Sequence, residues 1–285
     1  MNPSPLRYPG GKHKMYKYTK ELVLNNKIDT YIEPFCGGAG LALELLLKKD
    51  VKKIIINDYD YSIYCFWKSV IEYTEELIKK IESTDITIDE WYKQKKIRES
   101  IYDYSILDVG FSTLFLNRTN RSGIIDKAGP IGGYNQNGNY LIDCRFNKNT
   151  LIDKILKISC NKDKIEVYNM EAMDFIDDVI KKEKKAFTFF DPPYFNKGKG
   201  LYTNFYSTGD HRTLSSKIVG ELQNKKWIVT YDLAPEIAIM YHKIDKISFT
   251  LSYTLQDKKR GAEYLFFSKK VKRVEEKKYL QLLEE

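Results

Sequence analysis

The tetrapeptide Asp191-Pro192-Pro193-Tyr194, directly after the apolar run Ala186–Phe190, constrains this chain more than any other feature. A short apolar run of this kind predicts a buried strand. Ligands of α/β sheets bind outside the carboxyl ends of the strands, which is where this motif would lie. Two successive prolines fix φ and remove backbone donors, so the carbonyls beside Asp191 stay available as acceptors. The structural alternative is a proline-rich turn that Asp191 opens or caps.

A carboxylate, fixed carbonyls and an aromatic ring in one turn suit an amino group on a flat ring. Two acceptors on one NH2 group draw it out of conjugation and expose the nitrogen lone pair. The motif is therefore a candidate catalytic site for methylating an exocyclic base amine. Its candidate catalytic residues are Asp191, Pro192, Pro193 and Tyr194.

A strand–loop–helix–strand unit is predicted near the N-terminus. It consists of a strand at Thr30–Phe35, the glycine loop Cys36-Gly37-Gly38-Ala39-Gly40, a helix at Leu41–Lys49 and a strand at Lys52–Asp58. Glycines permit close backbone approach to a ligand. This is the first half of a nucleotide-binding fold.

The alternation of strands and helices stops after Asp58 and resumes at Lys164–Tyr168. The segment between is charged and helical in character, followed by a polar, glycine-rich stretch. The sequence therefore predicts an α/β, Rossmann-like core formed by residues 1–59 and 156–285, with a mainly helical insertion at residues 60–155.

Two carboxylates flank the glycine loop. Asp58 lies about twenty residues after the loop, where an acid typically hydrogen-bonds a ribose hydroxyl. Glu33 precedes the loop and could face a sulfonium or ammonium ion, or could be a turn residue. The Gly-Gly-x-Gly spacing is not the GxGxxG of NAD enzymes, and S-adenosylmethionine is the other cofactor that such a loop serves.

Composition favours a polyanionic partner. The 285 residues carry a formal net charge of +8 and a pI near 9.0, as expected of a nucleic-acid-binding protein. The four cysteines at 36, 65, 144 and 160 form no CxxC pair, and with three histidines no zinc-site spacing appears. No apolar stretch reaches signal-peptide or membrane-span length. We expect a cytoplasmic protein without a metal or a membrane partner.

Several motifs in order resemble those of the D12-class (Dam-like) adenine-specific DNA methyltransferases. They are Tyr8-Pro9-Gly10-Gly11-Lys12, Glu33-Pro34-Phe35-Cys36-Gly37-Gly38-Ala39-Gly40, Asn57-Asp58, Asp174-Phe175 and Asp191-Pro192-Pro193-Tyr194. The resemblance covers nearly the whole chain.

The resemblance implies S-adenosylmethionine as cofactor and assigns a set of residues to it. The Asp174-Phe175 pair would line the adenine of the cofactor. The candidate cofactor-binding residues are Tyr8, Lys12, Glu33, Phe35, Gly37, Gly38, Gly40, Asp58, Asp174, Phe175 and Asp191.

The resemblance also implies that the insertion recognises a DNA target. Its Leu116–Gly123 segment lies where this family carries a Leu-Asn-Arg motif entering a DNA-reading loop. Members that read GATC often have aromatic-Asn-Gly where this chain has Arg121-Ser122-Gly123, which argues against a GATC target. The alternative for these arginines is solvated loop charge or structural salt bridges. The candidate DNA-binding residues are Asn117, Arg118, Asn120 and Arg121, with Lys197 and Lys199 from a glycine-flanked cationic loop.

We therefore expect a site-specific DNA adenine N6-methyltransferase that flips the target adenine, serving restriction–modification or phage or host DNA protection. It would act as a monomer on double-stranded DNA, with a cognate restriction endonuclease as a further partner. One alternative is a methyltransferase for another planar amine, such as cytosine N4 or RNA adenine. The other is a DNA-binding protein without catalysis.

Overall fold

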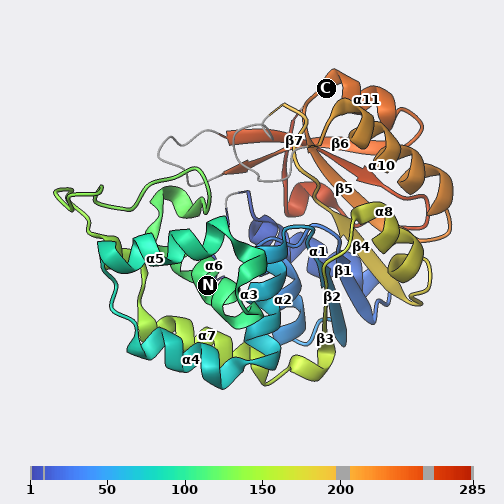
Figure 1. Cartoon of the computed structure of the whole chain (residues 1–285). Coiled ribbons are helices and arrows are strands. Elements are labelled where there is room, and N and C mark those ends of the chain that lie inside the picture. Colours follow the sequence, from blue (N-terminus) through green and yellow to red (C-terminus); the bar gives the residue numbers. More distant parts are fainter. Residues whose placement is uncertain (1, 9, 197–205, 253–259, 284–285) are drawn as a thin grey trace.

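The computed structural model describes residues 2–8, 10–196, 206–252 and 260–283. A single sheet runs through the molecule in the order β3-β2-β1-β4-β5-β7-β6-β8 (Figure 1). Its strands are β1 (Thr30–Glu33), β2 (Lys53–Asn57), β3 (Ile165–Tyr168), β4 (Ala186–Phe190), β5 (Lys226–Asp232), β6 (Asp245–Ser252), β7 (Arg260–Phe267) and β8 (Gln281–Leu282). Strands β1 to β5 run parallel to one another. The pairs β5–β7, β7–β6 and β6–β8 are antiparallel. This is a Rossmann-like α/β fold, as the sequence predicts.

The central strands are short and apolar because both of their faces are covered. Tyr31 and Ile54 face a cluster that includes α1 (Tyr16–Asn25) and α2 (Gly40–Leu47). Ile32 lies on the opposite face, in a second cluster. This second cluster includes residues of α8 (Ala172–Phe175), α10 (Thr208–Glu221) and α11 (Pro235–Met240). Short helical turns connect these elements: η1 (Lys12–Met15), η2 (Ile101–Asp103), η3 (Arg121–Gly123), η4 (Ile142–Arg145), η5 (Lys162–Lys164), η6 (Ile176–Ile180) and η7 (Glu276–Lys278).

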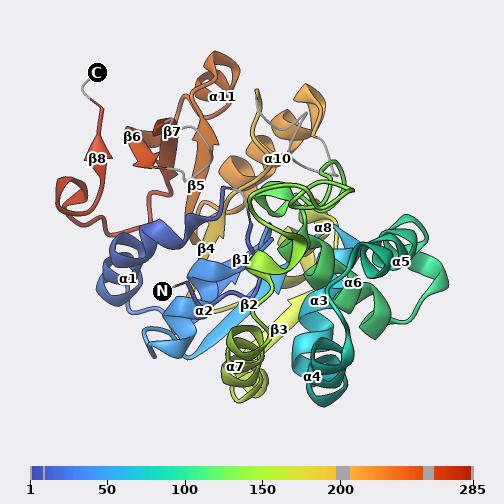
Figure 2. The same cartoon turned by 90° about the vertical axis from the view of Figure 1, so that its left-hand side faces the viewer.

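Five helices lie between β2 and β3: α3 (Tyr61–Glu72), α4 (Thr74–Ser83), α5 (Ile88–Glu99), α6 (Ile106–Thr119) and α7 (Lys148–Ser159). They gather on one side of the molecule, away from α10 and α11 (Figure 2). Helix α6 is buried for most of its length and packs against α3 and α5. The division at residues 60 and 155 stays a prediction, and residue 155 falls inside α7. Within the described ranges, no helix is both long and apolar enough to cross a membrane.

The strand order reverses at β1. The chain proceeds from β1 outward to β2 and β3, then returns to place β4 on the other side of β1. Loops that follow the two strands at such a switch point diverge and leave a crevice. The glycine loop follows β1 and Asp191-Pro192-Pro193-Tyr194 follows β4, so both predicted motifs flank this crevice.

Candidate active site

The N-terminal segment packs directly on the glycine loop. Gly37 has φ +43°, and a Cβ atom added there would lie 2.5 Å from the ring of Tyr8. At Gly38, an added Cβ would lie 2.8 Å from the Cβ of Tyr8. Glycine is therefore required at Gly37 both for the backbone conformation and for the contact with Tyr8.

The end of β2 fixes the same loop. The Gly37 N–H donates to Asp58 Oδ2 at 2.8 Å. The buried Asn57 amide donates to the carbonyl of Pro34 at 2.9 Å and to that of Met170 at 3.1 Å. Asn57 thus ties together the loops that follow β1 and β3.

A cavity of about 530 Å³ lies at this crevice. That volume is in the range of small-molecule sites. It is lined by most of the predicted cofactor residues and part of the catalytic motif: Tyr8, Lys12, Glu33, Phe35, Gly37, Gly38, Gly40, Asp58, Asp191 and Pro193.

Two carboxylates in the cavity wall have raised pKa values. Burial raises the pKa of Glu33 to about 8, with a further contribution from nearby Asp191. Burial likewise raises the pKa of Asp58 to about 7, with Asp60 adding to it. Each carboxylate is more costly to ionise here than in water, and a cation in the cavity would relieve that cost.

The carboxylate of Asp191 is held from two sides. Lys12 Nζ lies 2.8 Å from Oδ1 and 2.9 Å from Oδ2, and the Thr230 hydroxyl donates to Oδ1 at 2.7 Å. Lys12 also donates to the Tyr194 hydroxyl at 2.8 Å. The first predicted motif thus contacts the catalytic motif 179 residues away through one ammonium group.

The next strand supports the turn that follows the motif. Asp232, buried at the end of β5, accepts the backbone N–H groups of Phe195 and Asn196, each at 2.9 Å. Sequence reasoning missed Asp232 and Thr230, although both lie in the part of the chain that was predicted to form the core. The signal that could have found them is a polar residue at the carboxyl end of a strand beside the catalytic strand.

Four predicted site residues do not line the cavity. Phe175 is fully buried, with its ring edge-to-face on Tyr168, and Asp174 is exposed on α8. The neighbouring residues 170–172 line the cavity instead. Pro192 and Tyr194, both buried, are also absent from the lining.

Two of the predicted DNA contacts are internal. The Asn117 amide accepts from the Arg7 N–H at 2.7 Å and donates to the Arg7 carbonyl at 2.9 Å. Asn120 accepts from the Trp91 indole at 2.6 Å. Both asparagines are fully buried, so their amides shape the loop after α6 and do not face solvent. Arg118 is half-buried and Arg121 is exposed, whereas Lys197 and Lys199 lie outside the described residues.

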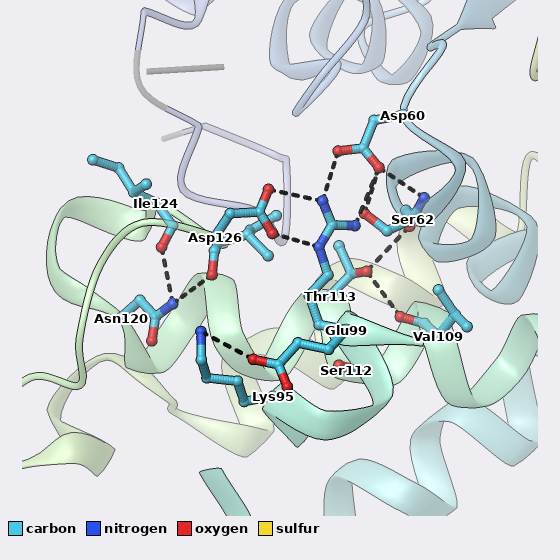
Figure 3. A network of polar contacts seen from close by, with 12 residues as sticks. Asp60, Ser62, Lys95, Glu99, Val109, Ser112, Thr113, Asn120, Ile124 and Asp126 are labelled. Atoms are coloured by element: carbon cyan, nitrogen blue, oxygen red, sulfur yellow. Dashed lines mark hydrogen bonds and ion pairs between the residues drawn. The ribbon is translucent and has the colours of Figure 1, made fainter. Parts of the chain in front are cut away.

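One arginine connects the insertion to the cavity wall. Arg98 donates to both oxygens of Asp126, at 2.6 and 2.9 Å, and to both of Asp60, at 3.2 and 3.1 Å. Figure 3 shows these two carboxylates facing one another across the network. Asp60 and Asp126 both line the cavity, so Arg98 holds the loop after α6 against the segment that follows β2.

No group of three or more histidine, cysteine or carboxylate side chains in the described ranges is arranged to hold a metal ion.

The fold and this cavity are those of a Rossmann-like α/β protein with a small-molecule site at its switch point. The sequence profile of the family described as D12 class N6 adenine-specific DNA methyltransferase matches residues 8–276. The chain belongs to this family, whose activity is methylation of adenine N6 in DNA.

Two further likenesses accompany the family match. The Type II methyltransferase M.MjaIII of Methanocaldococcus jannaschii is 26% identical over 245 residues, which cover 77% of this chain and 80% of that protein. The structure of the rRNA methyltransferase aviRa from Streptomyces viridochromogenes aligns with 93% of this chain and 88% of its own, at 12% identity and a TM-score of 0.36.

Proposed function

We propose that the cavity binds S-adenosylmethionine and that its carboxylates face the charged end of the cofactor. The observation that carries the proposal is the pair Glu33 and Asp58, whose raised pKa values mark a wall suited to a cationic ligand. When bound, this cofactor supplies an electrophilic methyl group on a sulfonium sulfur. Asp58 also lies where an acid accepts from a ribose hydroxyl.

We further propose that Asp191 receives the amino group of the target adenine. That base must leave the duplex stack to reach the cavity, at a cost of a few kcal/mol. Lys12 and Thr230 hold the carboxylate in one orientation, and a carboxylate with about four acceptor positions still has capacity for an N6 hydrogen. The Pro192 carbonyl would be the second acceptor. As N6 gains the methyl group it loses one proton, and Asp191 is the nearest proposed acceptor. Preorganised acceptors and positioning supply the catalysis.

Tyr194 is proposed to stack on the extruded base. Its side chain is 8% exposed, and its hydroxyl accepts from Lys12. The proposal therefore requires that the ring face become uncovered as the base enters. An aromatic stack on a base contributes about 1–3 kcal/mol.

The test is a nucleoside analysis. Purified protein is incubated with unmethylated mixed-sequence DNA and S-adenosylmethionine, and the digested nucleosides are identified by mass. We expect N6-methyladenine from the wild type and none from Asp191→Ala, which should still bind the cofactor. Asp178→Ala, which removes an exposed carboxylate paired with Lys182, is the matched control and should retain activity. Near-normal turnover by Asp191→Ala would reject the catalytic assignment, and methylated cytosine would reject the adenine.

We propose that the protein acts as a monomer beside a cognate restriction endonuclease. The Type II designation of the Methanocaldococcus jannaschii relative supports this pairing. Sequencing of methylated plasmid DNA would give the recognition sequence, and an endonuclease blocked by that methylation would be the partner. Sedimentation of the protein on a short duplex would test the monomer.

A further inference from the structure

Four cationic side chains converge beside the N-terminal segment: Arg7, Arg118 on α6, Arg145 on η4 and Lys154 on α7. We call them the cation cluster. The structure builds this convergence through the backbone, because Asn117, adjacent to Arg118, holds both the N–H and the carbonyl of Arg7. Turn η4 packs against α6, which brings Arg145 alongside.

Two further contacts hold the N-terminal segment in this place. Lys154 Nζ donates to the carbonyl of Ser4 at 2.9 Å. Gly123, with φ +75°, presses on Arg7 so closely that an added Cβ would lie 2.4 Å from the Arg7 carbonyl oxygen. The position of Arg7 is therefore fixed by three separate elements.

The cation cluster is not neutralised within the described part of the chain. No carboxylate there lies within ion-pair distance of any of its four members. Arg7 Nη1 and Arg118 Nε are buried, and neither has a hydrogen-bond partner among the residues that the structure describes. Buried donors and charges without partners are costly, so such an arrangement is typical of a site completed by a ligand.

The pKa values of three members of the cluster are lowered. Burial, together with repulsion from Arg7 and Arg145, lowers the pKa of Arg118 to about 10. Burial and Arg145 lower the pKa of Arg7, and burial and Arg118 lower that of Lys154. The guanidinium groups remain protonated at neutral pH, so the lowered pKa values express the cost of burial and, after it, a mutual repulsion, both of which an anion would offset.

We propose that the cation cluster binds a backbone phosphate of the DNA substrate. Arginine forks match the geometry of phosphate oxygens, and several cations around one anion suit a phosphodiester. None of the four side chains lines the cofactor cavity, so the site is separate from it. The inference rests on DNA being the substrate.

The chain places this phosphate close to the target nucleotide. Arg7 is five residues before Lys12, so their Cα atoms lie at most about 18 Å apart. Lys12 contacts Asp191. The bound phosphate therefore lies near the flipped adenine along the strand.

The first experiment measures the salt dependence of duplex binding by Arg118→Gln and Arg145→Gln. Each variant should bind about tenfold more weakly or worse, and its plot of log affinity against log salt should be shallower by about one unit. The loss should be equal on cognate and unrelated duplexes. The control is Lys162, an exposed lysine on the turn before β3, at the end of the sheet where the parallel strands begin. Lys162→Gln removes the same charge and should change neither the affinity for the duplex nor the salt slope. An unchanged slope, or a loss confined to the cognate duplex, overturns the proposal.

A second experiment locates the contact. A series of duplexes each carries one neutral methylphosphonate in place of a phosphate. Wild-type protein should lose affinity at one position near the target adenine, and Arg118→Gln should be insensitive to the change at that same position. Equal sensitivity of the two proteins at every position would show that the arginine does not contact a phosphate.

Two controls separate this inference from other failures. Wild-type protein that neither binds nor methylates DNA would reject the proposed function itself, whereas active wild type with unaffected variants rejects only the phosphate site. Without DNA, Arg118→Met should unfold at the same or a higher temperature than wild type and should bind S-adenosylmethionine normally. A lower unfolding temperature would mean that Arg118 is a structural residue.

Discussion

The cofactor cavity and the cation cluster both concentrate charge of one sign, but the signs are opposite. In the cavity, burial raises the pKa values of Glu33 and Asp58. In the cluster, burial and mutual repulsion lower the pKa values of Arg7 and Arg118. Each region is costly for the folded protein alone and is relieved by a ligand of opposite charge.

Other buried charges of the same chain are paired internally. Arg98 is half-buried, as are Arg7 and Arg118 of the cluster, yet it contacts both oxygens of Asp60 and of Asp126. Lys12 likewise has Asp191 within 2.8 Å. The difference teaches that the fold pairs a buried cation with its own carboxylates at sites where no ligand is expected to neutralise that cation. The unneutralised regions are therefore the informative ones.

The largest effect is expected at Lys12, where an ammonium group contacts a carboxylate inside the cavity. Lys12→Met removes the cation that holds Asp191. The Nζ atom of Lys12 also lies 3.9 Å from the buried carboxylate of Glu263. Misplacement of a catalytic group by about 1 Å can cost about 100-fold in rate, so kcat should fall by at least about that factor. Single-turnover kinetics at saturating cofactor would measure it. Lys12→Arg, which keeps the charge, should recover part of the loss, and equal losses in both variants would show that charge is not what Asp191 requires.

The next effect compares the paired with the unpaired arginine. Arg98→Met leaves two carboxylates without their partner and should lower the free energy of unfolding by about 3 kcal/mol. Arg118→Met removes an unpaired buried charge and should leave that free energy unchanged or raise it. Urea unfolding of the two variants, without DNA or cofactor, measures both. Equal destabilisation would remove the distinction drawn between the two regions.

The loops at the switch point could be predicted because local sequence determines them. The apolar runs before Cys36 and Asp191 mark two strands, and any residue that follows a parallel strand reaches the same edge of the sheet. Gly37 could be singled out for the same reason, since its backbone conformation and its contact with Tyr8 exclude a side chain. Fold class and cavity therefore follow from short stretches of chain.

The long-range polar partners could not be predicted. Arg98 meets carboxylates 38 and 28 residues away, and nothing in its own helical segment distinguishes it from other charged residues there. Asn117 and Asn120 were predicted to contact DNA because they lie in a segment that resembles the family's Leu-Asn-Arg motif, but their amides are buried and hydrogen-bonded within the protein. A buried amide that shapes a loop and an exposed one that binds a ligand have the same local sequence signal. Only the fold tells them apart.

The smallest effect is a pH dependence of cofactor binding on the acidic side of the comparison. Without ligand, Asp58 has a pKa of about 7, so it is largely protonated at pH 6 and largely ionised at pH 8. A ligand that needs the ionised form must displace a proton at the lower pH. The affinity for S-adenosylmethionine should therefore rise about tenfold between pH 6 and 8, with protons released on binding. Calorimetry in two buffers of different ionisation enthalpy measures both quantities.

The unliganded protein should show the opposite dependence on pH. Between the ordinary pKa of 4.5 for a glutamate and the value of about 8 for Glu33, the folded state binds more protons than the unfolded chain. The free energy of unfolding should then fall as pH rises through this interval, and cofactor should offset the fall.

Asp58→Asn removes the protonation of one wall carboxylate and should flatten the binding profile below pH 8. A profile equally steep in that variant would assign the proton to Glu33. A flat pH profile of cofactor affinity in the wild type would mean that neither carboxylate senses the cofactor. That result would reject the proposed role of Glu33 and Asp58 and would leave the proposal for the cation cluster unaffected.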